Sequence, residues 1–75
     1  MDKLNAMQLF VRIAETGSFT AVADQLGIDR SVITRQISAL EKQLGAKLMT
    51  RSTRSLTLTT AGSAYLEKCR VILNM

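Results

Sequence analysis

Residues 18–44 read SFTAVADQLGIDRSVITRQISALEKQL, and this stretch decides the fold. Two helical patterns flank a short turn at residues 26–29, which contains Gly27. A glycine can adopt the positive φ that ends one helix before the next begins. The stretch is therefore typical of a helix-turn-helix motif, although a two-helix corner of another small bundle could show the same spacing.

The second helical pattern, residues 30–44, is amphipathic. Its apolar residues recur at i, i+4, i+7 and i+11, so we predict that they share one buried stripe of the helix. These residues are Ile33, Ile37, Leu40 and Leu44. The opposite face carries Ser31, Arg35, Ser38 and Lys42, with Thr34 at its edge. Short polar groups interleaved with cations suit a DNA groove.

Both helices of the motif begin with capping residues. Ser18 precedes the first helix, and Asp29 precedes the second. We expect each side chain to accept a hydrogen bond from a free N–H group of its helix. The apolar side of the first helix should consist of Val22, Ala23 and Leu26. An earlier helix is predicted over residues 4–16, and its wide apolar face indicates a scaffold role.

After Leu44 the period of the sequence changes. Residues 47–51 and 55–59 are short, partly alternating and rich in Thr and Leu, so we predict two strands joined by a tip. A small hairpin that follows a recognition helix is a wing. Arg51 and Arg54 would lie in or beside its tip, where a cation can reach a phosphate or an adjacent minor groove.

The basic charge is concentrated in one part of the chain. The formal net charge of the 75 residues is +4, and six cations stand between Arg30 and Arg54 against the single anion Glu41. Elsewhere five anions outnumber four cations. We interpret Glu41 as an ion-pair partner on the helix surface. The local excess of cations is the electrostatic pattern expected for a polyanionic partner.

The last helical pattern, residues 61–75, has more apolar surface than one side of a helix needs, and Thr60 is placed to cap it. A compact domain could not cover this circumference, so we predict a symmetric dimer held through this helix. The predicted interface residues are Ala61, Tyr65, Leu66, Cys69, Ile72 and Leu73. Cys69 could approach its own copy across the axis, where we expect packing and not a disulfide.

The chain has one cysteine and no histidine, which argues against zinc clusters, intrachain disulfides and the nucleophile pairs of hydrolases. We therefore expect no metal, no cofactor and no enzymatic activity. No apolar run approaches the length of a membrane span and no signal peptide is visible, so we expect a cytoplasmic protein. A winged helix that binds protein is the alternative, but its exposed helix face should be apolar or acidic.

In the order and spacing of its pieces, the whole chain resembles the N-terminal DNA-binding domain of LysR-type transcriptional regulators. The matching pieces are Leu9-Phe10-Val11, Gly17-Ser18-Phe19-Thr20-Ala21, Thr34-Arg35-Gln36-Ile37, Leu40-Glu41, Leu44-Gly45, Leu48, Arg51, Arg54 and Leu58-Thr59-Thr60-Ala61-Gly62. The predicted fold is mainly α: a winged helix-turn-helix with a three-helix core and a small β-hairpin wing over residues 1–58. A C-terminal linker and dimerisation helix follows over residues 59–75.

The resemblance implies sequence-specific binding to double-stranded DNA at the bacterial nucleoid. Carried over to this chain, the base-reading residues are Arg30, Ser31, Thr34 and Arg35. The residues that contact the DNA backbone, in part through the wing, are Ser18, Thr20, Ser38, Lys42, Arg51, Thr53 and Arg54. Arg30 stands where the family often has Gln. Because Arg prefers guanine and Gln prefers adenine, the base preference at that step cannot be borrowed from relatives.

The resemblance also implies a particular assembly. Antiparallel linker helices would form a homodimer, and its two recognition helices would read an interrupted inverted repeat in successive major grooves. Full-length regulators of this type are expected to form higher oligomers. They usually continue into a larger domain that binds a small-molecule effector, so we expect this chain to be the DNA-binding fragment of a longer protein.

Overall fold

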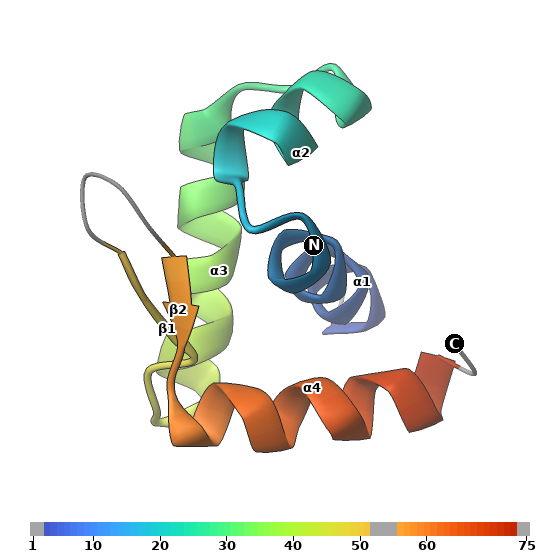
Figure 1. Ribbon diagram of the computed structural model, residues 1–75. Coiled ribbons are helices and arrows are strands. Elements are labelled where there is room, and N and C mark those ends of the chain that lie inside the picture. Colours follow the sequence, from blue (N-terminus) through green and yellow to red (C-terminus); the bar gives the residue numbers. More distant parts are fainter. Residues whose placement is uncertain (1–2, 52–55, 74–75) are drawn as a thin grey trace.

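The computed structural model describes residues 3–51 and 56–73, and this part of the chain forms four helices and one hairpin. In chain order the elements are α1 (Lys3–Thr16), α2 (Phe19–Leu26), α3 (Arg30–Leu44), β1 (Met49–Arg51), β2 (Leu56–Leu58) and α4 (Thr60–Leu73), as Figure 1 shows. The strands are antiparallel, with Met49 opposite Leu58 and Arg51 opposite Leu56. The predicted fold class, a mainly α winged helix-turn-helix with a further helix, is confirmed.

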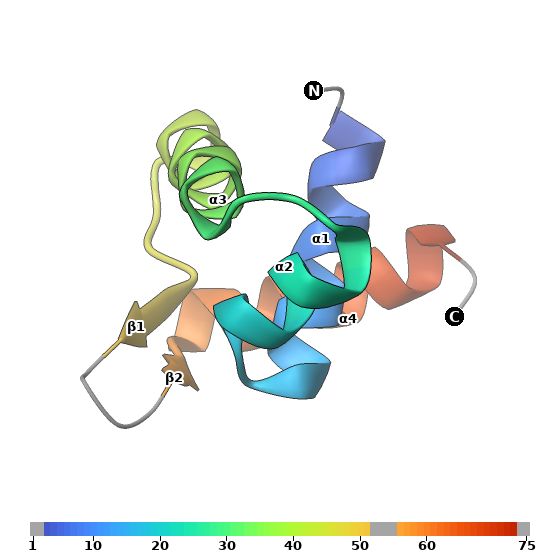
Figure 2. The same cartoon turned by 90° about the horizontal axis from the view of Figure 1, so that it is seen from above.

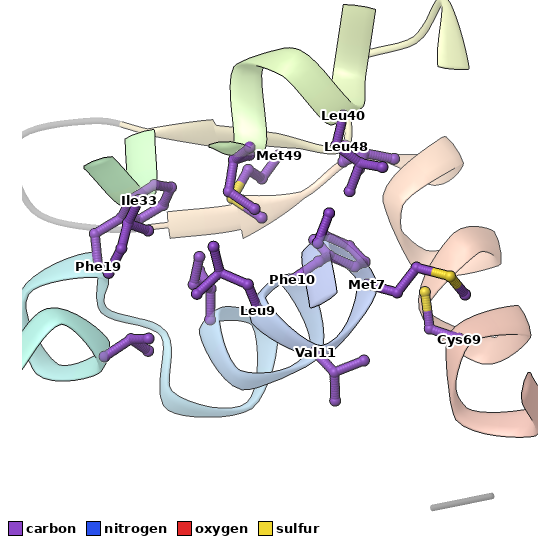
Figure 3. Close-up of a cluster of buried hydrophobic side chains, with 14 of the residues drawn as sticks. Met7, Leu9, Phe10, Val11, Phe19, Ile33, Leu40, Leu48, Met49 and Cys69 are labelled. Atoms are coloured by element: carbon purple, nitrogen blue, oxygen red, sulfur yellow. The ribbon is translucent and has the colours of Figure 1, made fainter. Parts of the chain in front are cut away.

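α1 is the central helix of the core. It packs against α2, α3 and α4. These three helices surround α1 in Figure 1, and the view from above in Figure 2 shows them next to it again. Six of its residues are buried: Ala6, Met7, Leu9, Phe10, Val11 and Ile13. Figure 3 shows Phe10 among the side chains of the core. The wide apolar face that the sequence predicts is therefore covered, apart from the half-exposed Leu4.

The helices of the motif are joined by a tight turn and by caps. Ser18 Oγ accepts a hydrogen bond from the N–H of Ala21 at 3.0 Å, which confirms the predicted cap of α2. Gly27 ends α2 with φ 68°, and Gly45 ends α3 with φ 70°. Glycine adopts this left-handed conformation without steric cost, so each helix stops where the next segment must turn away.

Three local predictions need correction. Asp29 stands at the N-cap position of α3, but its carboxylate makes no capping hydrogen bond. α4 is capped by Thr59 and not by Thr60: the Thr59 hydroxyl accepts from the N–H of Gly62 at 2.9 Å, so the helix begins one residue earlier than predicted. Leu26 is 41% exposed, because α2 is only eight residues long and ends at this residue.

The two strands are shorter than the sequence predicts. β1 begins at Met49, because the N–H of Leu48 donates to the carboxylate of Glu41 at 2.8 Å and not across the hairpin. β2 ends at Leu58. The predicted tip of the wing, residues 52–54, lies outside the described residues.

The root of the hairpin meets the start of α4 at Leu48. The Leu48 carbonyl oxygen accepts from the N–H of Thr59 at 3.0 Å, and the Thr59 hydroxyl donates to the carbonyl of Lys47. Gly62 comes so close that a Cβ atom placed on it would stand 1.8 Å from the Leu48 carbonyl oxygen. The absence of a side chain at Gly62 therefore allows α4 to pack directly on the hairpin root.

Candidate nucleic-acid interface

α3 separates an apolar inner face from a polar outer face. Ile33, Ile37 and Leu40 are buried and Leu44 is partly buried, which confirms the predicted stripe. Figure 3 shows Ile33 and Leu40 pointing into the core. Because this stripe packs against α1 and α2, the core fixes the direction of the outer face.

The outer face of α3 is polar and cationic. The four residues predicted for it are exposed: Ser31, Arg35, Ser38 and Lys42. Arg30, at the start of α3, is also exposed. Thr34 is partly buried, and its hydroxyl donates to the carbonyl oxygen of Arg30 at 3.1 Å. With its hydrogen used in this bond, Thr34 offers an incoming partner an acceptor oxygen.

A groove of about 370 Å³ runs between α3 and β1. The α3 side is lined by Thr34, Ser38 and Glu41, and the opposite side by Lys47, Met49 and Thr50. A second hollow, of about 480 Å³, shares Ser38, Glu41 and Lys47 with the groove and adds Lys42. Neither Lys47 nor Thr50 is among the site residues predicted from the sequence. Lys47 is one of the six clustered cations, but the strand pattern does not indicate which residues face the helix.

The remaining predicted contacts lie on α2 and on the hairpin. Ser18 is partly buried at the N-terminus of α2, and Thr20 is exposed in its first turn. Arg51 is the last residue of β1. The side chain of Arg51, and the whole of Thr53 and Arg54, lie outside the described residues.

Glu41 has a second partner that the sequence did not indicate. Glu41 is an ion-pair partner as predicted, since Oε1 lies 3.8 Å from Nζ of Lys47, but its side chain is only 11% exposed and Lys47 lies outside α3. Oε2 accepts from the N–H of Leu48 at 2.8 Å. This bond joins a side chain of α3 to the main chain before β1, and periodicity carries no signal for such a contact.

α4 turns one face to α1 and the other to solvent. Leu66 and Cys69 are buried, and the Tyr65 ring lies 5.7 Å from that of Phe10 between centroids. Of the other predicted interface residues, Ala61 and Ile72 are exposed and Leu73 is partly buried. The helix is indeed incompletely covered. The assignment of Leu66 and Cys69 to a dimer interface needs correction, because both are enclosed in the core of their own chain.

The outward strip of α4 is apolar. Val71 and Ile72 are 80% and 61% exposed, and a hollow here is lined by Ala64, Glu67, Lys68, Val71 and Ile72. The inward thiol is different: burial raises the pKa of Cys69, and burial together with the neighbouring Cys69 raises the pKa of Tyr65. Figure 3 shows the Cys69 sulfur beside Met7. Cys69 is therefore a protonated, packed thiol.

Residues 3–51 and 56–73 contain neither a cluster of metal-ligand side chains nor a helix that could span a membrane. No three His, Cys, Asp or Glu side chains in these ranges gather where they could hold a metal ion. No helix in the same ranges is long and apolar enough to cross a membrane.

Comparisons with known sequences identify relatives of this chain. The family model for the bacterial regulatory helix-turn-helix protein, lysR family, matches residues 4–63. A transcriptional repressor of the helix-turn-helix type from Pseudomonas aeruginosa is 51% identical over 73 residues, which are 97% of this chain and 23% of that protein. The transcriptional activator AaeR of Escherichia coli is 46% identical over 74 residues, 99% of this chain and 24% of the activator. The chain thus spans about a quarter of the length of these curated relatives.

Comparisons with solved structures agree. The DNA-binding domain of CbnR in complex with DNA is 41% identical and superposes with a TM-score of 0.90, covering 97% of this chain and 84% of that one. Full-length AphB, a virulence activator of Vibrio cholerae, is 38% identical with a TM-score of 0.90, covering 97% of this chain and 25% of AphB. Given the matched range, the shared fold and these identities, the chain belongs to the lysR family of bacterial regulatory helix-turn-helix proteins.

Proposed function

We propose that this chain is the sequence-specific, double-stranded DNA-binding domain of a LysR-type transcriptional regulator, acting at the bacterial nucleoid in the cytoplasm. The outer face of α3 carries the proposal, because its cations and hydroxyls are exposed while the opposite side of the same helix is packed in the core. A helix presented in this way can enter a major groove and reach base edges. The likeness of the whole chain to the DNA-bound CbnR domain supports this use of α3.

We assign base reading to the first turns of α3, through Arg30, Ser31, Thr34 and Arg35. Recognition helices contact bases mainly through residues near their N-termini. The exposed guanidinium of Arg35 can donate two parallel hydrogen bonds to guanine O6 and N7. Thr34 offers an acceptor oxygen, which suits an amino group of adenine or cytosine.

We assign backbone contacts to Ser18, Thr20, Ser38, Lys42, Arg51, Thr53 and Arg54. Ser18 and Thr20 lie at the N-terminus of α2, where free N–H groups favour a phosphate. Ser38 and Lys42 follow the base readers along the exposed face of α3. The wing residues are proposed from their place in the hairpin sequence. Contacts of this kind fix the register of the protein on DNA and carry no sequence information.

A salt titration tests the proposal. Duplexes that the protein selects from a random-sequence pool, and unselected duplexes, would each be titrated at several salt concentrations. We expect the logarithm of each binding constant to fall linearly with the logarithm of salt concentration, by about 0.9 per phosphate neutralised. The selected duplex should bind at least about 1,000-fold more tightly than the unselected one. Absence of binding to both duplexes at low salt would refute the function.

We also propose a symmetric dimer held through the outer strip of α4, which includes Ile72. The exposed Val71 and Ile72 support this, because association would remove their apolar surface from water. A two-fold axis would present two copies of α3 to half-sites about 34 Å apart, so the target would be an interrupted inverted repeat. Sedimentation at micromolar concentration tests the dimer. A monomer that binds one half-site tightly would contradict it.

A further inference from the structure

We propose that Lys47 is a further contact to the DNA backbone, placed beside Lys42 by hydrogen bonds of its own main chain. This inference rests on the proposed function and extends the site from α3 onto the root of the hairpin. It concerns a residue that neither the helical periodicity nor the predicted wing tip includes.

The main chain at Lys47 is fixed on several sides. Its carbonyl oxygen accepts the hydroxyl hydrogen of Thr59. The next N–H, that of Leu48, donates to Glu41 of α3 at 2.8 Å, and the Leu48 carbonyl accepts from the N–H of Thr59 at 3.0 Å. The Cα atom of Lys47 is therefore held between α3 and the start of α4, so little conformational entropy of the main chain remains to be lost on binding.

The ammonium group of Lys47, in contrast, is free to change partners. The side chain is 81% exposed, and Nζ lies 3.8 Å from Oε1 of Glu41, which is longer than a hydrogen bond. At this distance, and with the ammonium itself in solvent, the pair contributes little to stability, so the ammonium can leave it for a phosphate at small cost. Glu41 would still keep its hydrogen bond to the N–H of Leu48.

The surroundings of Lys47 suit a phosphate contact. Two hollows meet along Ser38, Glu41 and Lys47, and the second also brings in Lys42. Lys42 of α3 and Lys47 of the segment before β1 thus line one hollow together with Ser38. Glu41 is the single anion between residues 30 and 54, and its carboxylate is shielded because it is 11% exposed and faces Lys47 and Leu48. Its repulsion of DNA is correspondingly reduced.

The test is Lys47→Ala, with Lys3→Ala as the matched control. Lys3 is exposed at the start of α1, and α1 packs on the inner face of α3. Lys3→Ala therefore also removes one positive charge, but at a site that is not on the outer face of α3. We expect Lys47→Ala to lower the salt slope by about 0.9, and so to weaken binding about eightfold at about 0.1 M salt, on selected and unselected duplexes alike. Lys3→Ala should change affinity less than about twofold, and Lys47→Arg should restore the slope.

The outcomes separate this inference from the function on which it rests. If the unmodified protein binds neither duplex, the proposed function fails. If it binds both and Lys47→Ala behaves like Lys3→Ala, the Lys47 contact alone is refuted. A loss confined to the selected duplex would also overturn it, since removing a phosphate contact weakens binding to all sequences about equally. Because the Lys47 side chain is largely exposed, both alanine variants should unfold at the same urea concentration as the parent.

Discussion

α3 and α4 are similar helices with different outer faces. They contain 15 and 14 residues, and each buries three residues in the shared core. The outer face of α3 presents Arg35 and Lys42, whereas that of α4 presents Val71 and Ile72. The inner stripes therefore specify one fold, and the outer faces suit different proposed partners: a polyanion for α3 and an apolar protein surface for α4.

The largest expected effect concerns the inner stripe of α3. Ile37→Ala should lower the free energy of unfolding by about 2–5 kcal/mol, because Ile37 is 3% exposed and its truncation leaves a cavity. Urea unfolding followed by circular dichroism would measure the change. Ser38→Ala, one position further along α3 and exposed, is the control and should stay within about 0.5 kcal/mol of the parent. Equal losses in both variants would show that the two faces of α3 are not distinct.

A second effect on stability concerns the inner face of α4. Gly62→Ala should lower the free energy of unfolding by about 1–3 kcal/mol, because the new methyl group would overlap the Leu48 carbonyl oxygen and α4 would have to move outward. Ser63→Ala is the control, since Ser63 is exposed in the same turn. A Gly62→Ala variant as stable as the parent would mean that α4 leaves room for a methyl group between Gly62 and the Leu48 carbonyl.

The third effect distinguishes base contacts from backbone contacts on the outer face of α3. Arg35→Ala should cost about 1–3 kcal/mol on a selected duplex and much less on an unselected one, because it removes hydrogen bonds to a base edge. Lys42→Ala should weaken both duplexes similarly, as a phosphate contact does. Fluorescence anisotropy on the two duplexes would compare them. If Arg35→Ala weakened binding to both duplexes equally, Arg35 would be a contact to the DNA backbone and not to a base.

The smallest effect concerns the outer strip of α4. Ile72→Ser should weaken dimerisation by about 1 kcal/mol per copy, since a 61% exposed side chain gives up part of its apolar area on association. Stability of the fold should hardly change. Sedimentation equilibrium would measure the dissociation constant, with Ser63→Ala again as the control. An unchanged constant would place the dimer interface elsewhere on the molecule.

The same comparison explains how much the sequence could predict. α3 has one apolar stripe and one polar face, so its periodicity identified both the buried Ile37 and the exposed Arg35 correctly. α4 has apolar residues around most of its circumference, so periodicity could not indicate that Cys69 points inward and Val71 outward. The direction of such a helix is decided by the partner against which it packs, here α1.

Contacts between separate segments could not be predicted either. The bond from the Leu48 N–H to Glu41, and the bonds of Thr59 to Lys47 and Leu48, depend on where the hairpin root meets two helices. No local pattern encodes that meeting point, and the place of Lys47 in the groove follows from it. The proposed roles of Arg51 and Arg54 remain predictions from the sequence.

The two main-chain hydrogen bonds of Leu48 also have a mechanical consequence. Its N–H is bonded to Glu41 of α3, its carbonyl is bonded to Thr59, and Gly62 of α4 packs directly on that carbonyl. A rotation of α4 relative to α3 would therefore apply torque to Leu48, and it would turn the hairpin root unless these hydrogen bonds broke. Besides their shared packing on α1, α3 with its cationic outer face and α4 with its apolar outer face are thus mechanically connected through Leu48.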